Sequence, residues 1–286
     1  MTRTDTTLPA LGQAPAAPPW LQQHLLIADR ADGHAEQFAA ARLGPGMAAL
    51  EAAGVITAWH FLRKGDRWRL RYQPPSDRHA EAATAAVTTL LRAGLAARAL
   101  TGWRPVIYEP ETHAFGGPDG MEVAHRHFHT DSHHTLTYLR AVHDRERDDQ
   151  RRELALLLAT ALMRGAGLDW YEQGDVWATV ADHRTPAVVP TAALRASARR
   201  LISVDSSPGS RLISGQLAHA ATWFADHTAA GEGLAALALD GRLTRGLRAV
   251  TCHVLLFHFN RLGLSTNEQA LLATAAADTI LTTEDR

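Results

Sequence analysis

The sequence predicts an α+β fold: a single domain with an antiparallel sheet in the N-terminal half and a mostly helical C-terminal half. Short β-prone runs dominate the first third of the chain, and long Ala- and Leu-rich segments with helical spacing follow. Strands early and helices late favour α+β over an alternating α/β fold. The chain has 286 residues, of which 46% are hydrophobic, enough to bury a substantial core.

The N-terminal half is expected to supply the sheet. Residues 20–28 form an apolar strand, and the runs 55–63 and 68–72 form a hairpin across a Gly-containing link. Another strand is predicted at 104–109, before a loop at 115–120. Helical spacing predicts helices over 35–53, ending at Gly54, and over 80–99.

The C-terminal half is expected to be helical. Helices are predicted over 121–143 and 151–165, and further ones from Thr191, Leu212, Leu243 and Thr266, after a Pro-containing interruption at 186–190. Ser265 and Glu268 fit a capping box, in which each side chain satisfies a free amide at the start of a helix.

Composition narrows the function classes. The 29 basic and 30 acidic residues nearly balance, so bulk charge predicts neither a nucleic acid partner nor a membrane one. The single cysteine, Cys252, excludes an internal disulfide and suits a reducing cytoplasm. No apolar run reaches the roughly 18 residues of a membrane span. Residues 1–19 lack the apolar core of a signal peptide and are expected to be a flexible arm before a domain over 20–286.

Histidines are densest between residues 125 and 134. On a helix His125, His129 and His133 recur every four residues and share a face, which would allow two or three imidazoles to reach one metal ion. The intervening residues supply no carboxylate base of the kind a catalytic zinc motif carries. A solvated or partly packed histidine face is therefore the favoured interpretation, and no metal is predicted.

Arginines concentrate on the predicted hairpin. Arg69 and Arg71 point to one face of their strand, and Arg63 closes the strand before it. Two adjacent guanidiniums can bind a carboxylate or phosphate through bidentate hydrogen bonds. From the pattern alone, the polar outer face of a half-buried strand is the favoured interpretation, because that is the commoner meaning of alternation.

A histidine near the C-terminus is the third candidate. His258 and Arg261 are three apart on an apolar helix and share a face. Such a histidine suits proton transfer near neutral pH, although a core histidine bonded to backbone explains the pattern as well. The chain lacks G-x-G-x-x-G, P-loop, G-x-S-x-G and H-E-x-x-H motifs, so a nucleotide, a flavin or a serine nucleophile has no support, and no cofactor is expected.

Taken in order, four segments resemble one family. They are Trp59–Lys64 with Trp68–Tyr72, Tyr108–Glu111 with Phe115–Gly117, Phe128–Ser132, and His258–Gly263. The sequence resembles the thiopeptide-type bacteriocin biosynthesis family. This family comprises the C-terminal elimination domain of class I lantibiotic dehydratases, its free-standing relatives, and the thiopeptide pyridine synthases. The likeness extends over about residues 20–280.

The resemblance implies a stand-alone, peptide-tailoring lyase. A separate glutamylation enzyme would use glutamyl-tRNA to esterify Ser or Thr of a ribosomal precursor peptide. This protein would then expel glutamate and leave dehydroalanine or dehydrobutyrine. The family's motifs place catalytic roles on Arg69, Arg71 and His258. They place substrate binding on Arg63, Tyr108, Glu111, Asn260 and Arg261.

The chemistry needs such residues. The α-proton beside an amide is weakly acidic, so the developing enolate must be stabilised by preorganised donors, and glutamate leaves as an anion that arginine can bind. Many relatives have Arg-Tyr before Gly-Gly, whereas this chain has Ala114-Phe115. That difference either shifts the role to Arg63 or weakens the prediction of elimination.

Two other functions stay open. One is a formal [4+2] cycloaddition between dehydroalanines that builds a pyridine and expels the leader peptide. The other is a non-catalytic partner that presents the precursor peptide to a dehydratase. Retention of Arg69, Arg71 and His258 favours elimination. Whether the chain forms a homodimer is also open.

Overall fold

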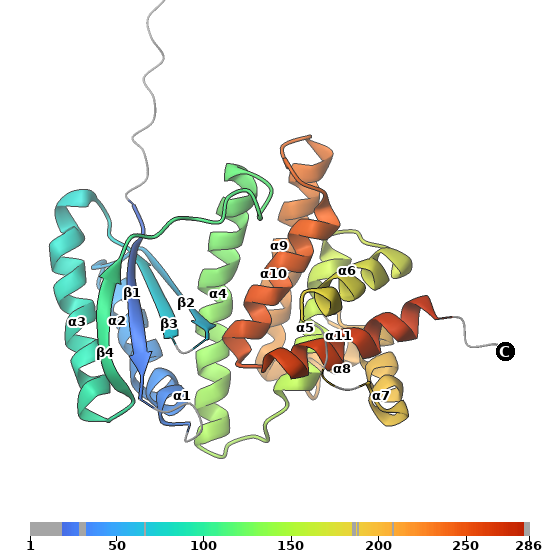
Figure 1. The fold of residues 1–286 in the computed structure, drawn as a ribbon, viewed down its shortest axis with the longest axis horizontal. Helices are drawn as coiled ribbons and strands as arrows, with labels where there is room; N and C mark the ends of the chain where they lie inside the picture. The colour runs from blue at the N-terminus through green and yellow to red at the C-terminus, as the bar shows by residue number, and fades with distance from the viewer. Residues whose placement is uncertain are drawn as a thin grey trace, which may run out of the picture.

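The predicted α+β class is confirmed by the computed structural model, which describes residues 19–28, 33–65, 67–184, 187, 189–207 and 209–282. A four-stranded antiparallel sheet from the N-terminal part lies beside a group of helices from the C-terminal half (Figure 1). The strand order is β2-β3-β1-β4. The strands are β1 (Leu21–Ile27), β2 (Ala58–Lys64), β3 (Arg67–Gln73) and β4 (Leu100–Val106). The arm predicted over 1–19 lies, except for its last residue, outside the described residues.

Helices of the N-terminal part fill the segments between these strands. They are α1 (His34–Phe38), the π-helix η1 (Ala39–Leu43), α2 (Gly44–Ala52), the 3₁₀-helix η2 (Asp77–His79) and α3 (Ala80–Ala96). The helix predicted over 35–53 is therefore one run with a π turn in its middle. The π turn directly precedes Gly44 and Pro45, and proline lacks the amide hydrogen for an ordinary i→i−4 bond.

Every regular element described in the C-terminal half is a helix. The helices are α4 (Pro118–His143), α5 (Arg151–Gly165), α6 (Trp170–Asp182), α7 (Ala192–Ser203), α8 (Arg211–Ser214), η3 (Ala218–Ala220), α9 (Ala221–Leu239), α10 (Leu247–Leu262) and α11 (Thr266–Leu281). The capping box predicted at Ser265 and Glu268 is present at the start of α11. No helix in this part or elsewhere among the described residues is long and apolar enough to cross a membrane.

Several predicted elements differ from the structure. Strand β4 begins at Leu100 rather than at 104, because Gly102 and Pro105 hide the strand pattern, although an edge strand tolerates proline. Strand β2 begins at Ala58, three residues later than predicted. Helix α6 was not predicted, although Asp169 and Glu172 form a capping box at its start.

The two faces of the sheet have different environments. Trp68, Leu70 and Tyr72 are buried on the face toward α1–α3, where the Tyr72 hydroxyl lies 3.1 Å from Oγ1 of Thr84 on α3. Because side chains alternate along a strand, Arg69 and Arg71 lie on the opposite face, as predicted. This second face is the one that positions the candidate site.

Helix α4 covers the β2 edge of the sheet. It runs beside β2 at the centre of the molecule (Figure 1), and the backbone amide of Phe61 donates a hydrogen bond to Oγ of Ser132 at 3.2 Å. A strand edge with unsatisfied amides is a site for unwanted pairing, and this contact covers it. Helix α4 thereby joins the sheet to the helical half.

Candidate functional site

A cavity of about 700 Å³ lies where the C-terminal end of β2 meets helices α10 and α11. Leu62 of β2 forms part of one wall, and His253, Phe257 and Asn260 of α10 form part of the other. Its charged lining comprises Arg63, Lys64, Arg151 and Arg184 against Glu36 and Glu111. Four cationic side chains and two carboxylates make the lining of this cavity net positive.

Arg71 is the most enclosed of the hairpin arginines, with 3% of its surface exposed. In the sheet it stands between Gln22 of β1 and His60 of β2. Its Nε donates to Oε1 of Gln22 at 2.7 Å, and its guanidinium lies 4.2 Å from the ring centroid of Tyr108. Burial lowers the pKa of Arg71 to about 10, so the side chain remains cationic at neutral pH.

Tyr108 and His125 form a pair beside Arg71. The Tyr108 hydroxyl lies 2.8 Å from Nε2 of His125 on α4. Burial raises the pKa of Tyr108 to about 12, although the charge of Arg71 opposes this shift. Burial and Arg71 lower the pKa of His125 to about 4. Both side chains are therefore neutral at pH 7, which gives an O–H donor facing an imidazole acceptor next to a cation.

A second cluster surrounds Asp131 of α4, and all its members are fully buried. Asp131 accepts hydrogen bonds from Nδ1 of His258 at 2.9 Å and from Nε of Arg261 at 2.6 Å. The indole of Trp223 on α9 donates a third, at 2.8 Å. Burial alone would raise the pKa of Asp131, but His258 and Arg261 hold it well below its ordinary value.

His258 and Arg71, which were expected to act together, lie in different clusters. His258 has no exposed surface and is bonded to Asp131, whereas Arg71 lies at the Tyr108 pair. Between them, the guanidinium of Arg261 lies 4.6 Å from the ring centroid of Phe128, and Phe128 in turn contacts His60. Arg261 thus connects the two clusters.

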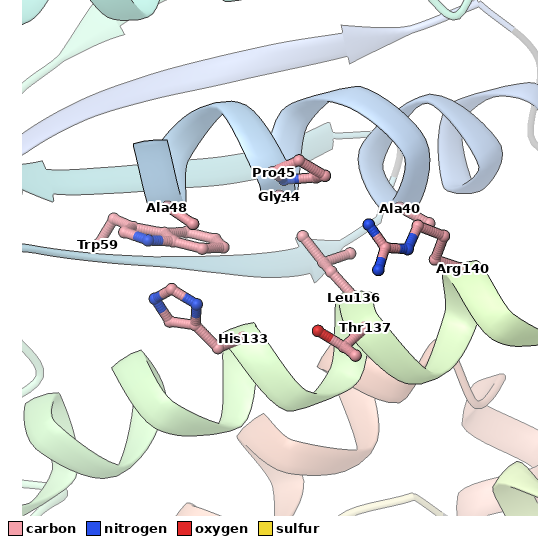
Figure 2. Close-up of a pocket in the computed structure, with 9 residues that line it drawn as sticks. All are labelled: Ala40, Gly44, Pro45, Ala48, Trp59, His133, Leu136, Thr137 and Arg140. Atoms are coloured by element: carbon pink, nitrogen blue, oxygen red, sulfur yellow. The ribbon is translucent and has the colours of Figure 1, made fainter. Parts of the chain in front are cut away.

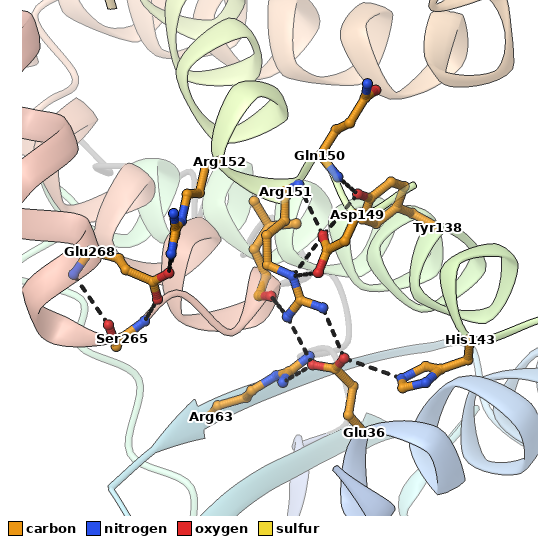
Figure 3. A network of polar contacts seen from close by, with 11 residues as sticks. Glu36, Arg63, Tyr138, His143, Asp149, Gln150, Arg151, Arg152, Ser265 and Glu268 are labelled. Atoms are coloured by element: carbon orange, nitrogen blue, oxygen red, sulfur yellow. Dashed lines mark hydrogen bonds and ion pairs between the residues drawn. The ribbon is translucent and has the colours of Figure 1, made fainter. Parts of the chain in front are cut away.

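Arg63 belongs to a network that fixes the end of α10 (Figure 3). Its Nη1 lies 2.5 Å from Glu36 of α1, and Arg151 of α5 binds the same carboxylate at 3.0 Å. Arg151 also donates to the backbone carbonyl of Leu262 at 3.2 Å. Burial raises the pKa of Glu36, but Arg63 and Arg151 outweigh it and bring the pKa to about 2. The network ties β2, α1 and α5 to α10.

Arg245 lies at the position where the sequence departs from its relatives. Its Nη1 donates to the carbonyl of Ala114 at 3.1 Å and lies 3.3 Å from Nδ1 of His253, which lines the cavity. A guanidinium therefore stands next to Ala114, although it comes from the segment before α10 rather than from residue 114 itself.

Three other residues predicted from the sequence lie on the sheet or in the cavity lining. Arg69 lies on the same sheet face as Arg71, between His24 and Leu62 of the neighbouring strands. Glu111 and Asn260 line the cavity, and Oδ1 of Asn260 accepts a hydrogen bond from Gln269 at 3.0 Å.

Sequence reasoning did not select Gln22, His60, His125 or Asp131 as site residues. His125 was part of the histidine run, and Asp131 was part of a family-like segment, so there was a reason in the sequence to consider both as site residues. His60 was likewise part of a family-like segment, whereas nothing in the sequence singled out Gln22, because its contact with Arg71 depends on strand register.

The chain thus combines a four-stranded sheet, a helical half and a net positive cavity where the end of β2 meets helices α10 and α11. The chain belongs to the lantibiotic biosynthesis dehydratase C-terminal family, whose profile matches residues 20–280. No curated protein matches the sequence.

Three solved structures share the fold at low identity. The tRNA-dependent lantibiotic dehydratase MibB from Microbispora sp. 107891 is 18% identical, with a TM-score of 0.64, over 95% of this chain and 29% of MibB. The chain thus spans less than a third of the length of MibB. TsrL is 16% identical, with a TM-score of 0.58, over 93% of this chain and 100% of TsrL. The pyridine synthase TbtD from thiomuracin biosynthesis is 16% identical, with a TM-score of 0.60, over 92% of this chain and 97% of TbtD.

Proposed function

We propose that this protein is a carbon–oxygen lyase that eliminates glutamate from glutamylated Ser or Thr of a ribosomal precursor peptide. The observation that carries the proposal is the net positive lining of the cavity, whose Glu111 also interacts electrostatically with the buried Arg71. The glutamyl group bears a free carboxylate and leaves as a second one, and buried arginines stabilise both. A separate enzyme that uses glutamyl-tRNA would supply the glutamylated peptide.

In the proposed step the α-carbon loses a proton, a C=C bond forms and the C–O bond to glutamate breaks. Tyr108 and His125 move the proton: the phenol oxygen accepts the α-proton while its own proton passes to Nε2 of His125. Arg71 stabilises the developing enolate, and Arg69 on the same face holds the glutamyl carboxylate. The anionic leaving group also offsets the positive charge that forms on His125.

The resemblance assigned proton transfer to His258, and its burial supports a different role. His258 orients Asp131, which holds Arg261 against Phe128 between the two clusters. In the proposed mechanism His258 is therefore a positioning residue. Arg63, Glu111 and Asn260 shape the cavity that receives the peptide.

The test uses two substrates with the full chain. One reaction contains glutamylated precursor peptide and the other contains the fully dehydrated peptide. Free glutamate and a dehydrated product in the first reaction are expected, as measured by mass spectrometry. Release of leader peptide in the second reaction alone would overturn elimination in favour of pyridine formation. If neither reaction turned over, elimination would also be overturned, in favour of a non-catalytic partner that presents the precursor peptide.

Pyridine formation is the second candidate, because Ala114 replaces the arginine that many relatives carry. The fold similarity to the pyridine synthase TbtD over 97% of that chain is compatible with this reaction. The cationic lining counts against it, since two dehydroalanines present no anion to bind.

A further inference from the structure

The histidine face of α4 meets a carboxylate that the sequence did not place beside it. His129 and His133 lie one turn apart on α4, and Glu51 at the end of α2 reaches both. Nε2 of His129 lies 3.1 Å from Oε1 of Glu51, and Nε2 of His133 lies 3.0 Å from Oε2. All three side chains are half-buried.

We propose that Glu51, His129 and His133 bind a divalent transition metal ion, zinc in the first instance, between α2 and α4. Two imidazoles and one carboxylate are a frequent zinc ligand set, and ligands at about 2.0–2.1 Å in a tetrahedron are separated by roughly 3.3 Å. The observed separations lie close to that value. Three protein ligands leave at least one position for water.

Backbone groups of β2 orient the ring of His129. Nδ1 of His129 lies 3.0 Å from the carbonyl oxygen of Trp59 and 3.3 Å from its amide nitrogen, and Nε2 on the other side of the ring is directed at Glu51. Histidine ligands of metals are commonly oriented in this way by a contact to their other ring nitrogen.

The surroundings suit a partly solvated ion. Figure 2 shows the imidazole of His133 directed from α4 toward the Trp59 indole, near Ala48 of α2. An adjoining hollow of about 450 Å³ is lined by Glu51, His129 and His133 and gives water access to the site. The same hollow carries His134, whose Nε2 lies 2.8 Å from Asp226.

The other potential set of metal ligands among the described residues comprises Asp131, His227 and His258, and its surroundings disfavour a metal. Both oxygens of Asp131 already accept hydrogen bonds, one of them from the guanidinium of Arg261. A metal ion there would lie beside a buried cation, whereas no arginine or lysine pairs with Glu51 in the part of the chain that the structure describes.

The experiment uses untagged full-length protein stripped of metal and then equilibrated with Zn²⁺. The variants are Glu51→Gln, which keeps the shape of the side chain, and His133→Ala. The control is His219→Ala, because His219 is exposed on the 3₁₀-helix η3. Wild type and control are expected to hold about one zinc ion per chain by elemental mass spectrometry. Both site variants should lose more than about 100-fold in affinity, beyond the roughly 10–100-fold that loss of an outer-shell partner costs.

A thermal scan provides a readout that does not depend on activity. Zinc should raise the melting temperature of wild type and His219→Ala, and leave that of Glu51→Gln unchanged, because only a bound ligand shifts folding stability. Equal zinc content in all four proteins would show adventitious binding elsewhere and overturn the site. Failure of the wild type to retain zinc would overturn it as well, whatever the outcome for glutamate release.

Discussion

The hydroxyl of Tyr108 lies 2.8 Å from Nε2 of His125, and the guanidinium of Arg71 lies over the ring of the same tyrosine. A donor, an acceptor and a cation therefore meet at one point of the sheet's second face. Strand β3 supplies the cation, the segment after β4 supplies the phenol, and α4 supplies the imidazole. Proton transfer and anion stabilisation can occur together there.

Tyr108→Phe should abolish proton transfer while preserving the fold, because only the hydroxyl is lost. Elimination from a glutamylated peptide should slow by about 10²–10⁴-fold. The control is Tyr171→Phe, since Tyr171 is 68% exposed and lies on α6. Single-turnover assays by mass spectrometry measure both. An unchanged rate for Tyr108→Phe would exclude the proposed dyad.

Arg71→Lys keeps the charge and loses the planar fork of the guanidinium. Glutamylated peptide should accumulate, because lysine cannot make bidentate contacts or the hydrogen bond to Gln22 in the same geometry. Arg69→Lys should cause a smaller loss of elimination activity, seen mainly as a higher KM for glutamylated peptide. Arg104→Lys is the matched control: Arg104 is exposed and belongs to the same face of the sheet on β4. Equal activity in the Arg71 and Arg104 variants contradicts the role of Arg71.

Arg245→Ala tests whether this guanidinium replaces the arginine missing at Ala114. The variant should raise KM for glutamylated peptide, because a cation beside the cavity residue His253 is removed. Arg242→Ala removes a neighbouring arginine that is exposed and pairs with Asp119. KM for Arg242→Ala should remain at the wild-type value. If both substitutions raised KM by the same amount, the effect would come from the loss of positive charge in general rather than from the loss of a specific binding contact.

Asp131→Asn should destabilise the protein strongly. Breaking a fully buried ion pair leaves Arg261 without its counter-charge, which costs about 3–5 kcal/mol of unfolding free energy. The comparison is Asp226→Asn, which breaks a partly exposed pair with His134 worth about 0–1 kcal/mol. Urea unfolding of both variants at neutral pH measures the difference. Similar midpoints would mean that the buried cluster contributes little to stability.

Acid should destabilise the native state partly through Glu36. Its pKa is about 2 in the folded protein against an ordinary value of 4.5, so the unfolded chain binds the proton first as the pH falls. The stabilisation is complete above pH 4.5 and is lost between about 4.5 and 2. The drop in unfolding free energy from about pH 6 to pH 3 should therefore be smaller in Glu36→Gln than in wild type. Parallel curves for the two proteins would argue against the Glu36 network.

The sequence by itself determined the α+β class, most element positions, the family and the sharing of one face by Arg69 and Arg71. These properties depend on local patterns: periodicity, turn residues and motif order, which a linear chain displays directly. His258 and Arg261 were likewise expected to share a face, and both contact Asp131 in the structure.

Tertiary structure alone decided which of those residues meet. Strand register brings Gln22 and His60 to either side of Arg71, and the packing of α4 against β2 brings His125 near Tyr108. Packing of α10 against α4 buries His258 against Asp131, 127 residues away in the chain, and packing of α2 against α4 brings Glu51 to His129 and His133. Contacts between residues so far apart depend on how helices and strands pack, and no local pattern of hydrophobicity or charge encodes that.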